Sequence, residues 1–158
     1  MKYTVQGADK FIKKIQMTST RALMYCGEYL QGKLQDELRK DSYDTGNLAR
    51  SIVYRKVDDY TVEVGSALEY AAVREYWRKP GTFPNLDALV GWSARKGMIT
   101  GGATQRYDDL YYKDKGTIFL IARAIATRGI EWKHTFRNVF NREKQNILDL
   151  YTDLMKQW

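Results

Sequence analysis

The chain has 158 residues, of which 44% are hydrophobic and 28% charged, and its formal net charge is +7. This length and composition fit one folded domain and argue against wholesale disorder. No stretch approaches the roughly 20 consecutive apolar residues that cross a bilayer, no apolar secretory signal opens the chain, and the single cysteine excludes an internal disulfide framework. We therefore expect a protein that is made and folds in a reducing cytosol, with no membrane partner.

The first part of the chain predicts one long amphipathic helix over about residues 8–40. Apolar side chains, with Phe11 and Ile15 among the first, recur there at three- and four-residue steps. Gly27 and Gly32 interrupt the pattern, and each weakens a helix by about 1 kcal/mol relative to alanine. We expect a bend or a close contact at these two glycines.

A β-hairpin is predicted next, over about residues 51–65. Val62 and Val64 alternate with polar residues, and β-forming residues precede them. Asp58 and Asp59 form the predicted connection between the strands. Adjacent carboxylates at a hairpin tip, without a third ligand, indicate turn formation more than a metal or acid–base pair.

The middle of the chain is less regular. Residues 68–77 fit either a short helix or a third strand. A proline- and glycine-containing loop and a short helix, capped by Asn85, are predicted over about residues 78–97. Residues 100–116 have no usable period and predict a mobile polar loop that could order on binding.

Two further helices complete the predicted fold. Thr117 is expected to cap a helix over residues 117–129, which Gly129 and Ile130 would close, and a last helix is expected over about residues 133–156. We therefore predict an α+β fold, in which a small antiparallel β-sheet packs against long N- and C-terminal helices in a single domain.

Few residues in the sequence could carry catalysis. His134 is the only histidine, and one histidine with one cysteine cannot build a typical zinc site. The chain has no glycine-rich loop with the lysine of a phosphate cradle. Glu63, Glu69 and Glu75 could converge as hydrolytic carboxylates, although nothing in their spacing requires it. We expect no catalytic, cofactor-binding or metal-binding residue, and a small hydrolase stays open as an alternative.

Basic side chains are concentrated in the later part of the chain. Residues 67–158 carry 15 basic and 10 acidic side chains, against 11 and 9 in residues 1–66. Such a surplus attracts nucleic acid, although a solvated helix face that keeps the protein soluble would look the same. The charge pattern leaves both interpretations open.

A series of short motifs runs in order through the chain. It consists of Thr45-Gly46-x-Leu48-x-x-Ser51, Val64-Gly65-Ser66, Tyr70-Ala71 with Glu75, Pro80-Gly81, Trp92, Lys96-Gly97, Ile121-Ala122-Arg123-x-Ile125 and Gly129-Ile130. In order and spacing these motifs resemble those of the head-to-tail joining, or tail-completion, proteins of lambda-like long-tailed bacteriophages. The chain departs from that family at Trp77, where glycine often follows the Glu–aromatic pair.

The resemblance implies a structural virion protein of the phage neck, assembled in the cytoplasm of the bacterial host. Its partners would be the head connector and the tail tube proteins, and by family analogy it would form a ring of about six copies. Thr45, Gly46, Leu48 and Ser51 would then shape the turn from helix to strand.

Other residues receive candidate roles in such a ring. Tyr70, Glu75 and Trp77 are candidates for the subunit interface, because amphipathic aromatic side chains are good anchors, although packing in the domain's own core is equally open. The candidates for non-specific contact with duplex DNA in a central channel are Arg123, Arg128 and Arg137. The alternative function is a free, small, basic nucleic-acid-binding protein.

Overall fold

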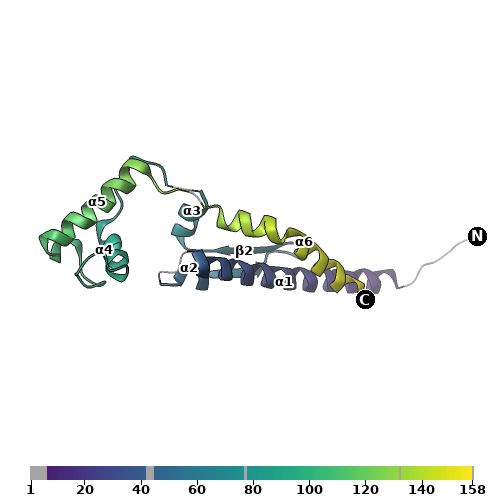
Figure 1. The fold of residues 1–158 in the computed structure, drawn as a ribbon. Helices are drawn as coiled ribbons and strands as arrows, with labels where there is room; N and C mark the ends of the chain where they lie inside the picture. Colours follow the sequence, from purple (N-terminus) through teal and green to yellow (C-terminus); the bar gives the residue numbers. More distant parts are fainter. Residues whose placement is uncertain (1–6, 42–44, 77, 132, 158) are drawn as a thin grey trace, which may run out of the picture. The chain divides into compact units, whose positions relative to one another are not determined.

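A computed structural model describes residues 7–41, 45–76, 78–131 and 133–157 of the chain (Figure 1). The chain divides into two compact units, the first made of residues 1–68 and 135–158 and the second of residues 69–134. The second unit is thus an insertion in the sequence of the first. Helices dominate and one small antiparallel sheet is present, which confirms the α+β fold class.

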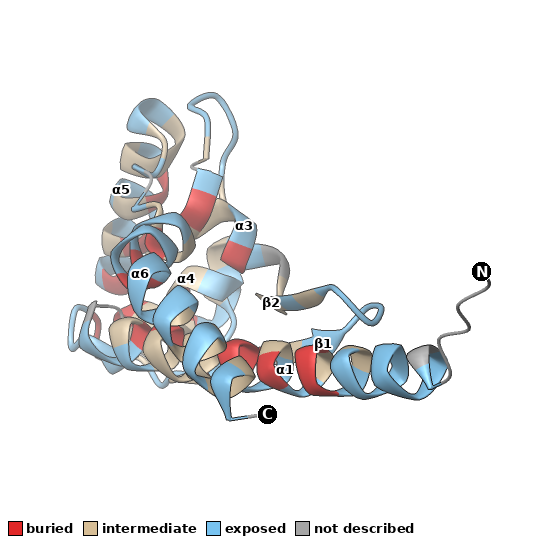
Figure 2. Ribbon diagram, turned by 90° about the vertical axis from the view of Figure 1, so that its right-hand side faces the viewer, coloured by how far each residue is buried: buried red, intermediate tan, exposed pale blue. Residues whose placement is uncertain are grey.

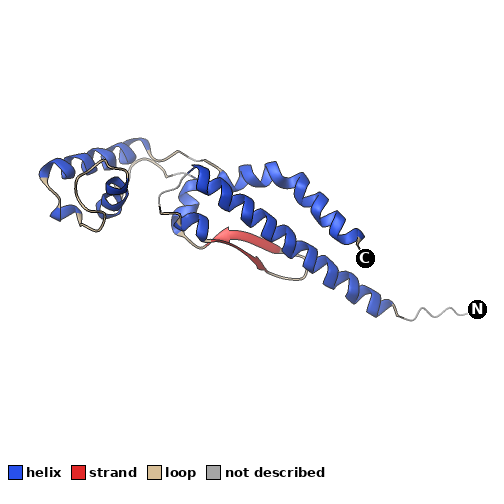
Figure 3. Ribbon diagram, turned by 60° about the horizontal axis from the view of Figure 1, so that its bottom comes forward, coloured by secondary structure: helices blue, strands red, loops and turns tan. Residues whose placement is uncertain are grey.

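The first unit consists of two long helices, a short helix and a β-hairpin. These elements are α1 (Ala8–Asp41), α2 (Asn47–Arg50), β1 (Ile52–Lys56), β2 (Val62–Ser66) and α6 (Thr135–Lys156). The two strands pair in antiparallel register, with Tyr54 opposite Val64. The hairpin and α6 both lie along α1, as Figure 3 shows. The predicted packing of a small sheet against long terminal helices is therefore confirmed.

The core of the first unit lies where these elements meet. Its buried side chains are Leu34, Leu38, Ala49, Ile52 and Val139. They come from α1, α2, β1 and α6, because the apolar stripe of each helix faces the inner side of the hairpin or the other helix. Leu48 and Val64, which belong to two of the sequence motifs, pack against this cluster.

The predicted apolar stripe of α1 is buried over only part of its length (Figure 2). Phe11 is 65% exposed and Ile15 is 43% exposed. Further along α1, Gln16 donates a hydrogen bond to Tyr60 beside the hairpin, and Ser19 lies within hydrogen-bond distance of Tyr151 on α6. Periodicity marks an apolar face of a helix, but the length of the neighbouring elements decides how much of it is covered.

Gly27 allows the hairpin to approach α1 closely. A Cβ atom at this position would lie 2.6 Å from Cγ1 of Val62 and 3.3 Å from Cβ of Tyr54. At Gly32 the structure places no atom within 4 Å of such a Cβ. The expected close contact therefore exists at Gly27 and not at Gly32.

The second unit is helical. Its elements are α3 (Glu69–Tyr76), α4 (Leu86–Arg95), the 3-10 turn η1 (Tyr107–Asp109) and α5 (Tyr112–Arg128). The segment that fitted either a helix or a strand is thus the helix α3. Asn85 caps α4, as predicted, by accepting a hydrogen bond of 2.9 Å from the backbone N–H of Asp87. The core of this unit consists of Val90, Ile99, Leu110 and Ile118.

The predicted start of the helix at Thr117 is wrong. The helix α5 begins at Tyr112, so the predicted loop over 100–116 is shorter and its last residues are helical. Thr117 lies inside α5, where its hydroxyl donates to the carbonyl of Lys113 at 3.2 Å.

Asp114 explains the early start of α5. Its buried carboxylate accepts the hydroxyl of Thr100 at 2.8 Å and the backbone N–H groups of Thr100 and Gly101 at 3.2 and 3.0 Å. The hydroxyl of Thr100 and these backbone donors hold the pKa of Asp114 below its ordinary value. A polar anchor of this kind leaves no hydrophobic period, so the sequence did not reveal it.

The two glycines of α1 provide a matched test of the packing. We expect Gly27→Ala to lower the free energy of unfolding by about 1–3 kcal/mol, because the new methyl group must displace the hairpin. Gly32→Ala should raise it by up to about 1 kcal/mol through helix propensity alone. Urea unfolding followed by circular dichroism measures both, and equal stability of the two variants would contradict the close contact at Gly27.

Candidate functional site

The first two sequence motifs meet at one joint in the first unit. Gly46 precedes α2 in the left-handed region, with φ 73° and ψ 3°, which favours glycine. The hydroxyl of Ser51 donates to the carbonyl of Leu48 at 2.8 Å and lies 2.7 Å from the hydroxyl of Ser66. Ser66 Oγ in turn accepts the backbone N–H of Leu68 at 3.1 Å. These hydroxyls fix the course of the backbone from α2 into the hairpin and from the hairpin to Leu68.

Two later motifs meet at a second joint, in the second unit. Arg78 and Ile130 form a backbone bridge with hydrogen bonds of 3.0 and 3.2 Å. The N–H of Gly81 donates to the carbonyl of Ala126 at 2.7 Å. Gly129 has φ 77°, and a Cβ atom there would collide with the carbonyl oxygen of Arg78. The Pro80-Gly81 and Gly129-Ile130 motifs therefore form a clasp, by which we mean the backbone contacts between residues 78–81 and 126–130.

The predicted interface residues have different environments. Tyr70 lies on α3 and is half-exposed. Glu75 is only 7% exposed in the single chain, which favours packing within the chain itself. Trp77 lies outside the described residues.

The three predicted channel arginines belong to two different units. Arg123 and Arg128 are exposed on α5, whereas Arg137 is on α6 and belongs to the other unit. Within the described residues, Arg123 and Arg128 make no ion pair with another side chain.

The acidic pair at the hairpin tip forms a turn. Asp58 accepts the backbone N–H of Tyr60 at 2.7 Å, and this bond contributes most to a pKa below the ordinary value. Asp59 pairs with Lys56 at 2.6 Å. In the part of the chain that the structure describes, no three His, Cys, Asp or Glu side chains are placed to hold a metal ion.

A groove that the sequence did not predict runs between α1 and α6. Its volume is about 440 Å³. It is lined by Tyr25, Glu28, Tyr29, Gly32, Lys33, Asp36, Leu150 and Leu154. Sequence periodicity places each residue on a helix face, but a groove depends on how two distant helices pack.

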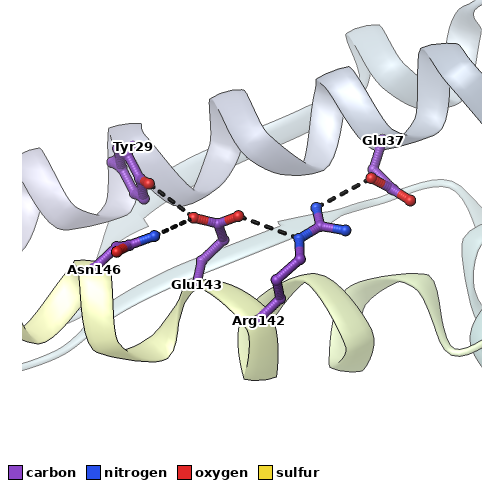
Figure 4. A network of polar contacts seen from close by, with 5 residues as sticks. All are labelled: Tyr29, Glu37, Arg142, Glu143 and Asn146. Atoms are coloured by element: carbon purple, nitrogen blue, oxygen red, sulfur yellow. Dashed lines mark hydrogen bonds and ion pairs between the residues drawn. The ribbon is translucent and has the colours of Figure 1, made fainter.

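A polar network holds α6 against α1 beside this groove (Figure 4). The Glu143 carboxylate, 7% exposed, accepts hydrogen bonds from the Tyr29 hydroxyl at 2.8 Å and the Asn146 amide at 2.9 Å. Arg142 donates to Glu143 at 3.2 Å and to Glu37 at 3.1 Å, which joins the two helices a second time. The hydrogen bonds from Asn146 and Tyr29 contribute most to lowering the pKa of Glu143 to about 2.

Within the described residues, no helix is long and apolar enough to span a membrane.

Comparison with known proteins gives a match to a protein family. Residues 5–76 match the model of a family described as "Bacteriophage HK97-gp10, putative tail-component". No curated protein and no solved structure matches the chain. The match covers α1, the hairpin and α3, together with the first three motifs, and it ends before the clasp. It confirms the resemblance to phage head–tail proteins that these motifs indicated.

The low pKa of Glu143 predicts an acid-sensitive contact between α1 and α6. Because this pKa is lowered from 4.5 to about 2 in the folded chain, ionised Glu143 stabilises the fold above pH 4.5, and this contribution is lost as the pH falls toward 2. We expect Glu143→Gln to be less stable than the wild type at neutral pH, with a difference that shrinks in acid. Urea unfolding at several pH values measures this difference.

The matched control for Glu143→Gln is Glu63→Gln. Glu63 forms an exposed ion pair of 2.8 Å with Arg55 on the hairpin, so its loss should change stability little. A Glu143→Gln deficit that stays constant from neutral to acidic pH would contradict the role of the ionised carboxylate.

Proposed function

We propose that this chain is a structural protein of the phage neck that joins the head connector to the tail. The proposal is based on the match of residues 5–76 to the model of the HK97-gp10-like phage tail-component family. The protein would form a ring of about six copies around the DNA channel. In this proposal the protein is not an enzyme, and it is built into the virion after synthesis in the host cytoplasm. The family match is the observation that carries the proposal.

The motif residues shape the backbone, and this supports a structural role. Gly46, Ser51, Ser66 and Gly129 all fix the backbone at joints. None of them is part of a cluster suited to acid–base or nucleophilic chemistry. A subunit that packs repeatedly against identical neighbours needs a defined backbone shape.

Exposed apolar side chains support assembly. In the single chain, large hydrophobic side chains are exposed on α1, on the hairpin and on α5, and they include Phe11, Met17, Val53 and Leu120. Apolar surface of this kind is typical of proteins that bind other subunits. Tyr70 belongs to the same class and stays our proposed contact residue on α3.

The second candidate function is that of a free nucleic-acid-binding protein. The exposed Arg123 and Arg128 on one helix favour it. It requires tight binding of duplex DNA by the isolated chain, with an affinity that falls steeply as salt is raised. The neck proposal expects weak binding until the ring has assembled.

Immunogold labelling with copy counting by mass spectrometry tests the neck proposal directly. We expect label at the junction of head and tail, at about six copies per particle. The measurement uses particles induced from the source strain, with a known tail tube protein as the internal standard. Intact, infectious particles without the protein would overturn the proposal.

Charge reversal tests the channel. We propose that Arg123, Arg128 and Arg137 face the DNA, so replacing each with glutamate should lower the retention of packaged DNA and the number of infectious particles. Lys144→Glu, which changes an exposed charge on α6, serves as the control. Unchanged DNA retention in all three variants would remove the channel from the proposal.

A further inference from the structure

We infer that the groove between α1 and α6 receives the outer face of α5 from a second copy of this chain. The outer face of α5 is defined here as Tyr112, Gly116, Leu120 and Arg123. The inference rests on the proposed function, because a contact between two different surfaces of identical subunits, repeated around an axis, closes a ring.

The missing side chain of Gly32 leaves open space in the groove. Gly32 lies in the interior of α1, where glycine costs about 1 kcal/mol relative to alanine. Apart from its chain neighbours and the nearby backbone of its own helix, no described atom lies within 4 Å of the position of its missing Cβ. Gly27, five residues earlier, is explained by the hairpin packed on it. Tyr25 and Leu154 supply apolar surface to the same groove. The groove is thus shaped to accept apolar side chains close to the helix backbone.

One acidic side chain at the rim has no partner of its own. The Lys33 ammonium lies 5.1 Å from the centre of the Tyr29 ring, and Asp36 pairs with Arg39 at 3.4 Å. Glu28 makes no ion pair with any residue that the structure describes. The rim therefore offers an unneutralised carboxylate to an approaching basic group.

The helix α5 has an inner and an outer face. Ile118 and Ala122 are fully buried on the inner face. On the outer face Leu120 is 64% exposed and Tyr112 is 93% exposed. Residues 112, 116, 120 and 123 follow the three- and four-residue spacing that places side chains on one side of a helix.

Gly116 is the counterpart of Gly32. It lies between Tyr112 and Leu120 on the outer face, and apart from its own stretch of helix no atom of the described residues lies within 4 Å of the position of its missing Cβ. A glycine on each surface would let two helices approach closely, because no Cβ atom separates their backbones. Neither glycine has a packing role among the described residues.

The two surfaces complement each other in polarity and charge. Leu120 would insert over Gly32 and contact Leu150 and Leu154, while the guanidinium of Arg123 would reach the Glu28 carboxylate. The groove volume of about 440 Å³ has room for several side chains but not for a whole helix, so α5 would lie along the groove. In this arrangement Arg123 would contact Glu28 of the neighbouring subunit in place of DNA, and rescue of Arg123→Glu by Glu28→Arg distinguishes these two roles.

Disulfide trapping tests the contact. In a Cys26→Ser background, one form of the chain carries Gly32→Cys and another carries Leu120→Cys, and both are incorporated together into particles. We expect oxidation to give disulfide-linked dimers of one form with the other, since neither form alone has both thiols. A chain carrying both substitutions should give a ladder of linked subunits.

A cysteine outside the groove serves as the control for disulfide trapping. Leu148→Cys places a thiol on an exposed part of α6 outside the groove, and it should not link to Leu120→Cys. Two outcomes would overturn the inference and leave the neck proposal intact. In the first, particles contain the protein at full copy number but give no dimer; in the second, the doubly substituted chain forms only a disulfide within one chain. Absence of the wild-type protein from particles would overturn the neck proposal, and the inference with it.

A charge swap separates a subunit contact from a DNA contact. Arg123→Glu should lower incorporation into particles by about tenfold, because it places two carboxylates together. Adding Glu28→Arg should restore incorporation. The same Glu28→Arg change should not rescue Arg128→Glu, and failure to rescue Arg123→Glu would contradict the pairing.

Discussion

The packing of α6 on α1 in the first unit depends on one buried carboxylate. Glu143 lies between α1 and α6, and a charge in such a place is tolerated only when donors surround it. Tyr29, Asn146 and Arg142 supply these donors and thereby fix how far α6 can slide or turn against α1. Because Tyr29 also lines the groove, the same contact shapes the surface to which we assign a second copy of the chain.

The motifs are best understood as joints of the backbone. The bond between Ser51 and Ser66 ties the start of the hairpin to its end, and the clasp ties the two ends of the inserted unit. A joint requires small residues and hydroxyls at fixed spacings, which leaves a sequence signal even where the surrounding residues vary freely. This accounts for a resemblance to phage tail proteins that is carried by glycines, serines and turns.

Much of the fold was predictable from local patterns. The period of α1 and α6, the alternation in the hairpin and the Asn85 cap each depend on neighbouring residues in the chain. The start of α5, the exposure of Phe11 and the groove at Gly32 depend on partners far away in the sequence. Asp114, for example, is an ordinary helix residue until Thr100 and Gly101 surround its carboxylate. The roles of the candidate arginines were least predictable, because charge alone does not identify a partner.

The insertion has a consequence for how the chain folds during synthesis. The hydrogen bond from Tyr29 to Glu143 joins residues 114 positions apart, and α6 leaves the ribosome after the other described elements. The first unit therefore has to wait for its second long helix, whereas residues 69–134 can fold as soon as they emerge. Once the clasp has formed, residues 82–125 no longer lengthen the loop that must close when α6 packs on α1. Folding of the inserted unit would thus lower the entropic cost of packing α6 on α1.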